Sequence, residues 1–383
     1  MLIEDLKTPA LLLDRNRLED NIDQMAKKAK TNRVRLRPHI KTHKCPEVAE
    51  LQLSAGAQGI TVSTVWEAAA FADSGFDDIT LAVPIVRDKV EFVVGLANDM
   101  NLTLLVDSRG PVGWLEEEAL KQQTRIGMLI KVDCGYHRCG VDPDTRELVE
   151  IAEMIENAEW LDFRGILTHA GHAYDAKSVQ DIRVIAEQEQ LAMSRAAEQL
   201  ARHSLKPAVL SIGSTPTMSL TPSIRDEITE IRPGNYVFYD YDQVALGSCS
   251  FSDCALTVLA SVIGNYGDRI VVDAGATALS KDLGPVHIDP ENGYGRVFAD
   301  RAIREPTGDR IVSVSQEHGK IQLEDDSPLR DIEPGDRIHI LSNHSCLTAN
   351  LFSQYYVHDG GERVIDRWRI MHKRHRTIMT ERY

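Results

Sequence analysis

One lysine of the sequence, Lys41, stands in a basic segment directly after a short apolar run. Residues 35–44 are RLRPHIKTHK, so two arginines and two histidines flank this lysine. A lysine becomes nucleophilic when partial burial among cationic groups lowers its pKa. The arginines and histidines at positions 35, 37, 39 and 43 could supply such a field. The pattern indicates a reactive lysine, although a basic surface loop would account for the same residues.

A second candidate is the pair His344 and Cys346, which follows the apolar run Arg337–Leu341. In extended backbone, residues two apart project to the same face, so an imidazole and a thiolate can converge on one ion. Nitrogen and sulfur ligands favour zinc over magnesium or calcium. Two ligands alone make a weak motif, because an exposed histidine beside a core thiol has the same pattern.

Three further segments combine small residues with polar groups: 132–141 (VDCGYHRCGV), 211–217 (SIGSTPT) and 232–236 (RPGNY). Small residues let backbone N–H groups and hydroxyls approach an anion closely. A tight strand-to-helix turn with Ser or Thr as the helix N-cap is the alternative for residues 211–217. Cys134 and Cys139 lack a second cysteine pair, which makes zinc binding at residues 132–141 the weaker interpretation.

Short apolar runs alternate with stretches of helical period over the first two thirds of the chain. Eight strands separated by helices over about 200 residues fit a closed (β/α)8 barrel, although a doubly wound open sheet has a similar count. The predicted strands are Val34–Arg37, Gly59–Val62, Ile79–Ala82, Leu102–Val106, Met128–Val132, Phe163–Thr168, Ala208–Ile212 and Ile228–Ile231. The predicted helices are Glu47–Ser54, Val65–Ala72, Val90–Ala97, Glu147–Asn157 and Val179–Ala201.

After about residue 245 the apolar runs become short, rich in β-branched residues and bounded by turn residues. This pattern predicts a mostly antiparallel β domain. The runs are Ala255–Ile263, Arg269–Asp273, Arg310–Val314 and Arg337–Leu341.

The composition limits the class of protein. Fifty-eight acidic against 43 basic residues give a formal charge of −15, which opposes binding to nucleic acid or anionic membranes. The chain has no apolar stretch long enough to cross a bilayer, and its acidic start does not resemble a secretory signal. Six scattered cysteines suit a reducing compartment, so we expect a cytoplasmic protein. The basic cluster 372–376 (HKRHR) is expected to be a solvated helix end or tail.

The segment 37–44 (RPHIKTHK), together with 8–14 (TPALLLD), resembles the D-serine dehydratase and D-threonine aldolase family. This family lies within the alanine racemase-like, fold type III class of pyridoxal phosphate enzymes, and the similarity spans essentially the whole chain. The resemblance implies a TIM-like (β/α)8 barrel over residues 15–245, with residues 1–14 and 246–383 forming the β domain. A first strand around Ala10–Leu13 would join that β domain. The resemblance also implies a homodimer with its active sites at the subunit interface.

The same resemblance implies roles for individual residues. Lys41 would be the Schiff-base lysine, Arg138 would contact the phenolic oxygen of the cofactor, and Arg232 would lie near the pyridine nitrogen. His169 would lie under the ring. The remaining cofactor-binding candidates are His39, Tyr174 for the phosphate, Gly213, Ser214, Thr215, Gly234, Asn235 and, as a supporting contact, Tyr236.

The pair at His344 and Cys346 distinguishes the branches of the family, because dehydratases carry His-x-Cys where the aldolase branch has His-x-Asp. The resemblance therefore implies a zinc-dependent dehydratase that acts on D-serine, D-threonine or D-threo-3-hydroxyaspartate and yields a 2-oxo acid and ammonia. Aldol cleavage to glycine and an aldehyde, with a divalent metal such as Mn2+, is the nearest alternative. An amino-acid racemase and a non-catalytic pyridoxal phosphate-binding protein remain further alternatives.

Overall fold

The computed structural model describes residues 1–299 and 305–371, so the basic cluster 372–376 lies outside the described residues. Contacts divide the chain into two compact units, which we treat separately. Unit 1 comprises Met1–Gln24, Tyr174–Val179 and Asn235–His372. Unit 2 comprises Met25–Ala173 and Gln180–Gly234, together with residues 373–383, which are not described.

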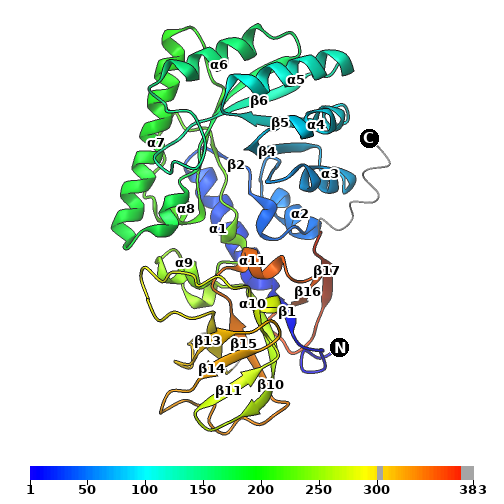
Figure 1. The fold of residues 1–383 in the computed structure, drawn as a ribbon, viewed down its shortest axis with the longest axis vertical. Coiled ribbons are helices and arrows are strands. Elements are labelled where there is room, and N and C mark those ends of the chain that lie inside the picture. The colour runs from blue at the N-terminus through cyan, green and yellow to red at the C-terminus, as the bar shows by residue number, and fades with distance from the viewer. Residues whose placement is uncertain (300–304, 372–383) are drawn as a thin grey trace. The chain divides into compact units, whose positions relative to one another are not determined.

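Unit 2 contains a sheet of eight parallel strands in the order β2-β9-β8-β7-β6-β5-β4-β3. Figure 1 labels β2, β4, β5 and β6 of this sheet. An isolated parallel bridge between His39 and Thr61 joins the two ends of this sheet. The eight predicted strands and the barrel are confirmed. The strands are β2 (Arg35–Leu36), β3 (Ile60–Val62), β4 (Asp78–Pro84), β5 (Asn101–Val106), β6 (Ile126–Lys131), β7 (Leu161–Leu167), β8 (Val209–Ile212) and β9 (Glu230–Ile231).

Helices connect these strands, as parallel pairing requires. The five predicted helices are present as α2 (Pro46–Ser54), α3 (Val65–Asp73), α4 (Val90–Ala97), α6 (Arg146–Asn157) and α7 (Val179–Arg202). Three others were not predicted: α1 (Arg15–Thr31), α5 (Arg109–Gln122) and α8 (Thr215–Leu220). In α5, Gly110, Pro111 and Gly113 interrupt the apolar stripe, and α8 has only six residues.

The interior of the barrel is layered, because alternate residues of each strand point inward. Leu105, Leu129 and Leu167 form an apolar layer. Lys131 lies two residues after Leu129, at the end of β6, and His169 lies two residues after Leu167, just beyond β7. Both are at the carboxyl ends of the strands, where barrel enzymes place their active sites.

The opposite, amino-terminal end of the barrel is polar. Arg37 donates to both carboxylate oxygens of Asp78 at 2.9 Å and to Oε2 of Glu230 at 2.9 Å. Glu230 is only 2% exposed, and its Oε1 accepts a hydrogen bond from the Ser211 hydroxyl at 2.7 Å. Arg37, which was expected to act on Lys41, is therefore paired with Asp78 and Glu230 at the amino-terminal end of the barrel.

Unit 1 contains a nine-stranded sheet in the order β11-β14-β13-β12-β15-β10-β1-β16-β17. Its pairings are antiparallel except that of β1 with β16, so the mostly antiparallel β domain and the joining of the first strand to it are confirmed. The strands are β1 (Ala10–Asp14), β10 (Leu256–Asn265), β11 (Arg269–Val272), β12 (Arg296–Phe298), β13 (Arg310–Val314), β14 (Gly319–Gln322), β15 (Arg337–Leu341), β16 (Gln354–His358) and β17 (Asp366–Arg369). Short helices α9 (Tyr241–Ala245), α10 (Ala276–Leu279) and α11 (Ser345–Ala349) interrupt the strands.

Within the described ranges, none of the helices has both the length and the apolar composition needed to span a membrane.

The contribution of the buried Glu230 carboxylate to the stability of the barrel can be tested by substitution. Glu230→Gln keeps the shape but removes the charge that balances Arg37, so we expect a loss of about 3–5 kcal/mol in the free energy of unfolding. Chemical denaturation measures this loss. Glu19→Gln, which removes an exposed partner of Arg15, is the control and should cost about 1 kcal/mol or less. Equal effects of the two substitutions would contradict the assignment.

Candidate active site

Lys41 lies in the short 3-10 helix η1 (Ile40–Thr42), directly after the bridge at His39. His39 caps this turn: its Nδ1 accepts a hydrogen bond from the Lys41 N–H at 3.5 Å, and its Nε2 lies 3.3 Å from the Ser63 hydroxyl. The Lys41 side chain is exposed and has no ion pair or hydrogen bond with any described residue. The amine is thus held at the carboxyl ends of the strands and is available for chemistry.

A group of cations surrounds the two histidines of this end of unit 2. Burial, followed by the charges of Lys41, Arg232 and His169, holds the pKa of His39 well below its usual value. Burial and Lys131, Lys41, Arg232 and Arg138 do the same to His169. Both imidazoles are therefore neutral at physiological pH. The structure brings together Lys41, His39, Arg138, His169 and Arg232 of the predicted site.

Lys131 belongs to this cluster and was missed from the sequence, because it was taken as part of the apolar strand Met128–Val132. Its side chain is 5% exposed and has no hydrogen bond or ion pair within the described ranges. Burial, with Arg232 nearby, lowers the pKa of its ammonium to about 8. A charged residue inside an apolar run was the signal that could have identified it.

Arg232 is fixed from behind by polar contacts. Its Nε donates to the Ser211 hydroxyl at 2.7 Å, and Nη2 donates to the Thr168 carbonyl. Ser211 in turn donates to Glu230. Burial lowers the pKa of Arg232 to about 10, so the guanidinium keeps its charge at neutral pH.

The segment predicted to bind phosphate, Gly213, Ser214 and Thr215, begins α8. Ser214 is the N-cap and forms a capping box with Thr217, so the turn that was left open as the alternative is present. The Ser214 N–H is already bonded to the Thr217 hydroxyl at 3.0 Å, and the Gly213 N–H donates to Glu189 at 3.0 Å. Phosphate binding by these two N–H groups stays a prediction, and it would require their present partners to be exchanged.

Glu189, on α7, was also missed. Its Oε1 accepts hydrogen bonds from the N–H groups of Ala170 and Gly213, both at 3.0 Å, and so connects the ends of β7 and β8. Its Oε2 is buried without a partner in the part of the chain that is described. Burial raises the pKa of this carboxyl group.

Arg138 is exposed and lies over an aromatic ring. Its Cζ is 4.9 Å from the centroid of Tyr136, which stacks on His172 at 5.9 Å. A Cβ at Gly171 would meet the Tyr136 ring at 2.3 Å, so this glycine lets the ring lie against the loop after β7. Tyr136 therefore positions the arginine that was predicted to contact the phenolic oxygen.

The composition of this cluster fits pyridoxal phosphate, whose phosphate and phenolic oxygen carry negative charge. Lys41, Lys131, Arg138 and Arg232 are four cations, and Glu189 and Glu230 are the acids whose charges act on Arg232. Four cations against two carboxylates leave a surplus of two positive charges, which favours the binding of an anionic group such as the phosphate. No side chain of the cluster has to change its charge to bind the anionic groups of the cofactor.

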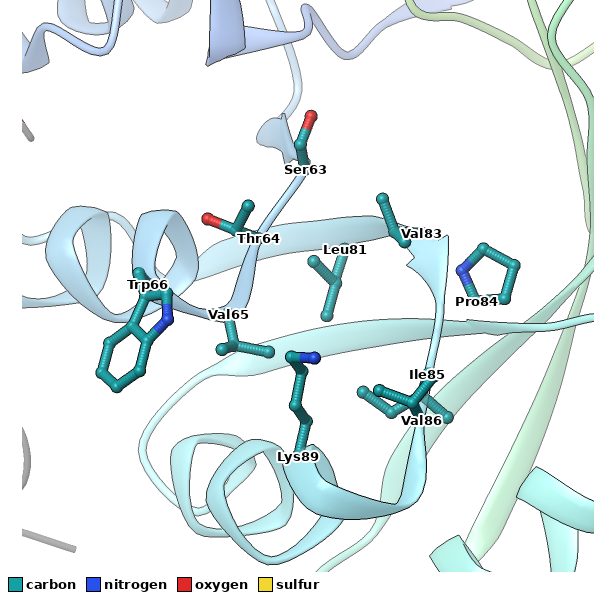
Figure 2. A pocket seen from close by; sticks show the side chains of 10 residues that line it. All are labelled: Ser63, Thr64, Val65, Trp66, Leu81, Val83, Pro84, Ile85, Val86 and Lys89. Atoms are coloured by element: carbon teal, nitrogen blue, oxygen red, sulfur yellow. The ribbon is translucent and has the colours of Figure 1, made fainter. Parts of the chain in front are cut away.

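An apolar pocket of about 290 Å³ lies at the ends of β3 and β4, next to Ser63 (Figure 2). Figure 2 shows Val65, Leu81 and Ile85 around it, with Lys89 as its cationic side chain. Lys89 lies 3.6 Å from Asp88. The pocket offers one ammonium and the hydroxyls of Ser63 and Thr64, whereas the cluster offers four cations, so the anionic groups of the cofactor fit the cluster better.

Three predicted cofactor residues belong to unit 1. Tyr174 lies in the 3-10 helix η3 (Gly171–Asp175) and Tyr236, fully buried, in η4 (Asn235–Val237). The Asn235 amide donates to Asp240 at 2.5 Å and to the Ser345 hydroxyl at 3.0 Å, and lies 3.7 Å from Sγ of Cys346. Gly234, the last residue before this unit, packs against the backbone oxygen of His39, which a Cβ would approach to 2.7 Å. The phosphate roles of these residues stay predictions.

The metal pair lies at the start of α11. His344 is its N-cap, and Cys346 is the second helical residue, so the expectation that both stand in extended backbone is wrong for the cysteine. The side chains nevertheless lie close together, since Cys346 and Asp282 raise the pKa of the His344 imidazole well above its usual value against the effect of burial. Nδ1 of His344 also lies 3.3 Å from Asp282 and 3.7 Å from Asp242.

The surroundings of this pair are acidic. Burial, with Asp240, Asp282 and Cys346 close by, raises the pKa of Asp242 to about 8. Oδ1 of Asp242 is buried and has no partner among the described residues. This shortage of positive charge fits a divalent cation, as the donor set His and Cys does. The described residues contain no group of three or more His, Cys, Asp or Glu side chains arranged to hold an ion. The pair would therefore leave coordination positions open.

The histidine next to the lysine segment gives a pH prediction. His43 is fully buried: its Nδ1 accepts from the Cys45 N–H at 3.1 Å, and its Nε2 lies 3.2 Å from Gln52 Oε1. Burial lowers its pKa to about 3 from the unperturbed value of 6.5. The unfolded chain thus binds a proton that the folded chain does not, and the contribution to stability, complete above pH 6.5, is lost as the pH falls toward 3.

We therefore expect His43→Gln to make the dependence of unfolding free energy on pH shallower by up to about 1.4 kcal/mol per pH unit between pH 6 and 4.5. Urea denaturation at several pH values measures this slope. The exposed His203, replaced in the same way, is the control and should leave the slope unchanged. A slope in His43→Gln equal to that of the unsubstituted protein would refute the assignment.

Comparisons with known proteins agree with this arrangement. Residues 13–242 match the alanine racemase N-terminal domain, and residues 255–358 match the putative serine dehydratase domain. A D-serine dehydratase of Dictyostelium discoideum is 35% identical over 387 residues, which cover 95% of this chain and 96% of that protein. A D-threo-3-hydroxyaspartate dehydratase of Delftia sp. (strain HT23) is 36% identical over 357 residues, 91% of this chain and 93% of that protein.

Among solved structures, a cysteine-to-alanine mutant of D-threo-3-hydroxyaspartate dehydratase in the metal-free form has a TM-score of 0.91 and 34% identity, covering 97% of this chain and 99% of that one. The chain therefore belongs to the alanine racemase-like family that includes the D-serine dehydratases and the D-threonine aldolases, which confirms the resemblance drawn from its two N-terminal segments.

Proposed function

We propose that the protein is a pyridoxal phosphate- and zinc-dependent dehydratase. Its substrate is a D-β-hydroxy amino acid such as D-serine, D-threonine or D-threo-3-hydroxyaspartate, and its products are a 2-oxo acid and ammonia. The observation that carries this proposal is the contact of His344 with Cys346 in an acidic surrounding, since it combines zinc ligands with a local excess of negative charge. The names of the dehydratase relatives support the same reaction.

Lys41 anchors the cofactor in this proposal and then removes the proton from Cα of the substrate. Its ammonium has no acid partner among the described residues, so its proton can be transferred without breaking an ion pair. When bound, pyridoxal phosphate supplies an electron sink for the bond that is broken at Cα.

Arg232, Arg138 and His169 hold and orient the cofactor. Arg232 keeps its proton at neutral pH, and its contacts with Ser211 and Thr168 leave it little freedom to turn. A guanidinium at the ring nitrogen would leave that nitrogen unprotonated. Neutral His169, whose Nδ1 lies 3.3 Å from the Gly213 carbonyl, offers a flat, uncharged surface for the ring.

His344 and Cys346 would hold the zinc ion, which as a Lewis acid would assist the departure of the β-hydroxyl group. The contact of Nδ1 with Asp282 orients the imidazole and leaves Nε2 for the metal. Asp240 fixes the start of α11 by accepting hydrogen bonds from the Ser345 N–H at 2.9 Å and hydroxyl at 3.0 Å. These contacts preorganise both ligands.

We further propose that the protein is a cytoplasmic homodimer with active sites at the subunit interface. The proposed barrel domain spans residues 15–245, and residues 1–14 and 246–383 form the proposed β domain. None of the six cysteines forms a disulfide with another described residue, which supports the reducing compartment.

A product assay tests the reaction. We expect the purified holoenzyme to release a 2-oxo acid and ammonia in equal amounts from at least one of D-serine, D-threonine and D-threo-3-hydroxyaspartate, and not from their L-isomers. Zinc removal should abolish turnover, because hydroxide is a poor leaving group without a Lewis acid. Glycine and an aldehyde without 2-oxo acid would identify an aldolase instead. Inversion at Cα that survives chelation would identify a racemase.

Two variants separate the roles of the sites. Cys346→Ala should lose bound zinc and 2-oxo acid formation while it keeps the absorbance of the cofactor. Lys41→Ala should lose the covalently held cofactor and keep zinc. Metal analysis and absorbance spectra provide these readouts, with Cys249→Ala as the control for loss of a thiol. Unchanged turnover in Cys346→Ala would argue against a metal-dependent elimination.

A further inference from the structure

The amino-terminal end of the barrel in unit 2 contains a cavity of about 140 Å³ that the proposed reaction does not use. We call it the basal recess and define it by the charged and hydroxyl side chains that line it: Arg35, Arg37, Asp78, Thr80, Thr103, Arg164 and Glu230. Arg35, Asp78 and Glu230 are the first residues of β2, β4 and β9. The recess therefore lies at the end of the barrel opposite Lys131 and His169.

The acids of the basal recess are already engaged. Both oxygens of Asp78 and one of Glu230 bind Arg37, and the other oxygen of Glu230 accepts the Ser211 hydroxyl. Three arginines face two carboxylates, so one positive charge is left over. The surplus belongs to Arg35 and Arg164.

Arg164 is the less compensated of the two. Its single hydrogen bond in the described structure is from Nη1 to the Thr103 hydroxyl at 2.5 Å, and no described carboxylate lies within ion-pair distance of it. Burial lowers the pKa of this guanidinium, and the charges of Asp162 and Asp78 offset that shift only in part. A Cβ at Gly127 would lie 2.1 Å from its Cζ, so the bare glycine provides the space that the guanidinium occupies.

Arg35 lies on the open side of the recess. Its side chain is 36% exposed, and Nη2 is 3.9 Å from Glu230, at the limit of an ion pair. It has free donors and an approach from solvent. The recess is thus open to a small solute and has unused N–H groups at its rim and in its wall.

We propose that the basal recess binds a small oxyanion, a carboxylate or inorganic phosphate, between Arg35 and Arg164. Planar guanidinium groups bind the oxygens of carboxylates and phosphates in pairs. One bound negative charge would balance the single surplus positive charge of the three arginines and two carboxylates that line the recess. The volume admits an anion of the size of phosphate or acetate and excludes a nucleotide.

Thermal unfolding of the cofactor-loaded protein tests the proposal. The midpoint is measured with increasing sodium phosphate or sodium acetate, against sodium chloride at the same ionic strength. We expect a saturable rise in the midpoint with phosphate, acetate or both, beyond that in chloride, because a ligand that binds the folded state stabilises it. The stronger of the two probes identifies the preferred oxyanion.

Arg164→Gln should weaken the apparent affinity about tenfold to hundredfold, the loss expected for a charged hydrogen bond. Arg35→Gln, at the exposed rim, should weaken it as well and provides the test if the first variant does not fold. Arg125→Gln is the matched control, since this exposed arginine pairs with Asp162 outside the recess and its loss should leave the response unchanged. Responses no larger in phosphate and acetate than in chloride would overturn the proposal. A saturable response retained by both recess variants would also overturn it.

Discussion

The buried carboxylate of Glu230 is the charge on which the interior of the barrel depends. It lies between two buried arginines, with Arg37 bound directly and Arg232 bound through the Ser211 hydroxyl. Arg37 follows β2, Ser211 lies in β8 and Glu230 lies in β9, so the same contacts that neutralise the arginines also fix the register of these strands. Because taking one of these charges out of water costs several kcal/mol, the partners have to be present together.

The candidate site at the other end of the barrel has an excess of positive charge. Lys41, Lys131, Arg138 and Arg232 gather there, with Glu189 committed to two backbone N–H groups. Burial lowers the pKa values of His39 and His169, and the charges of the surrounding cations lower them further. An anionic cofactor would therefore relieve the repulsion among these cations. The site is therefore built for an anion.

The strands were predictable because an apolar run in a parallel sheet is buried on both faces, which makes its composition distinctive. The lysine segment and the metal pair were proposed from residue types and from the resemblance, and their roles stay predictions. Arg35 and Arg37 were misplaced because a strand rises roughly 3.3 Å per residue, which puts them in a lower layer of the barrel than Lys41. Glu189 and the acids around His344 were missed, since their role depends on contacts between segments far apart in the chain. A pattern read along the sequence does not contain such contacts.

The metal pair illustrates why local geometry matters more than spacing. In a regular helix, residues two positions apart in the sequence are separated by about 200° around the axis. A His-x-Cys pair inside a helix would therefore point its two side chains apart. Here the helix begins between them: His344 keeps extended backbone as the N-cap, while Cys346 is helical. Asp240 sets that starting point by binding both the N–H and the hydroxyl of Ser345, and it also binds Asn235. Convergence of His344 and Cys346 therefore depends on the buried Asp240, and the position of the helix start is what makes the pair a candidate metal site.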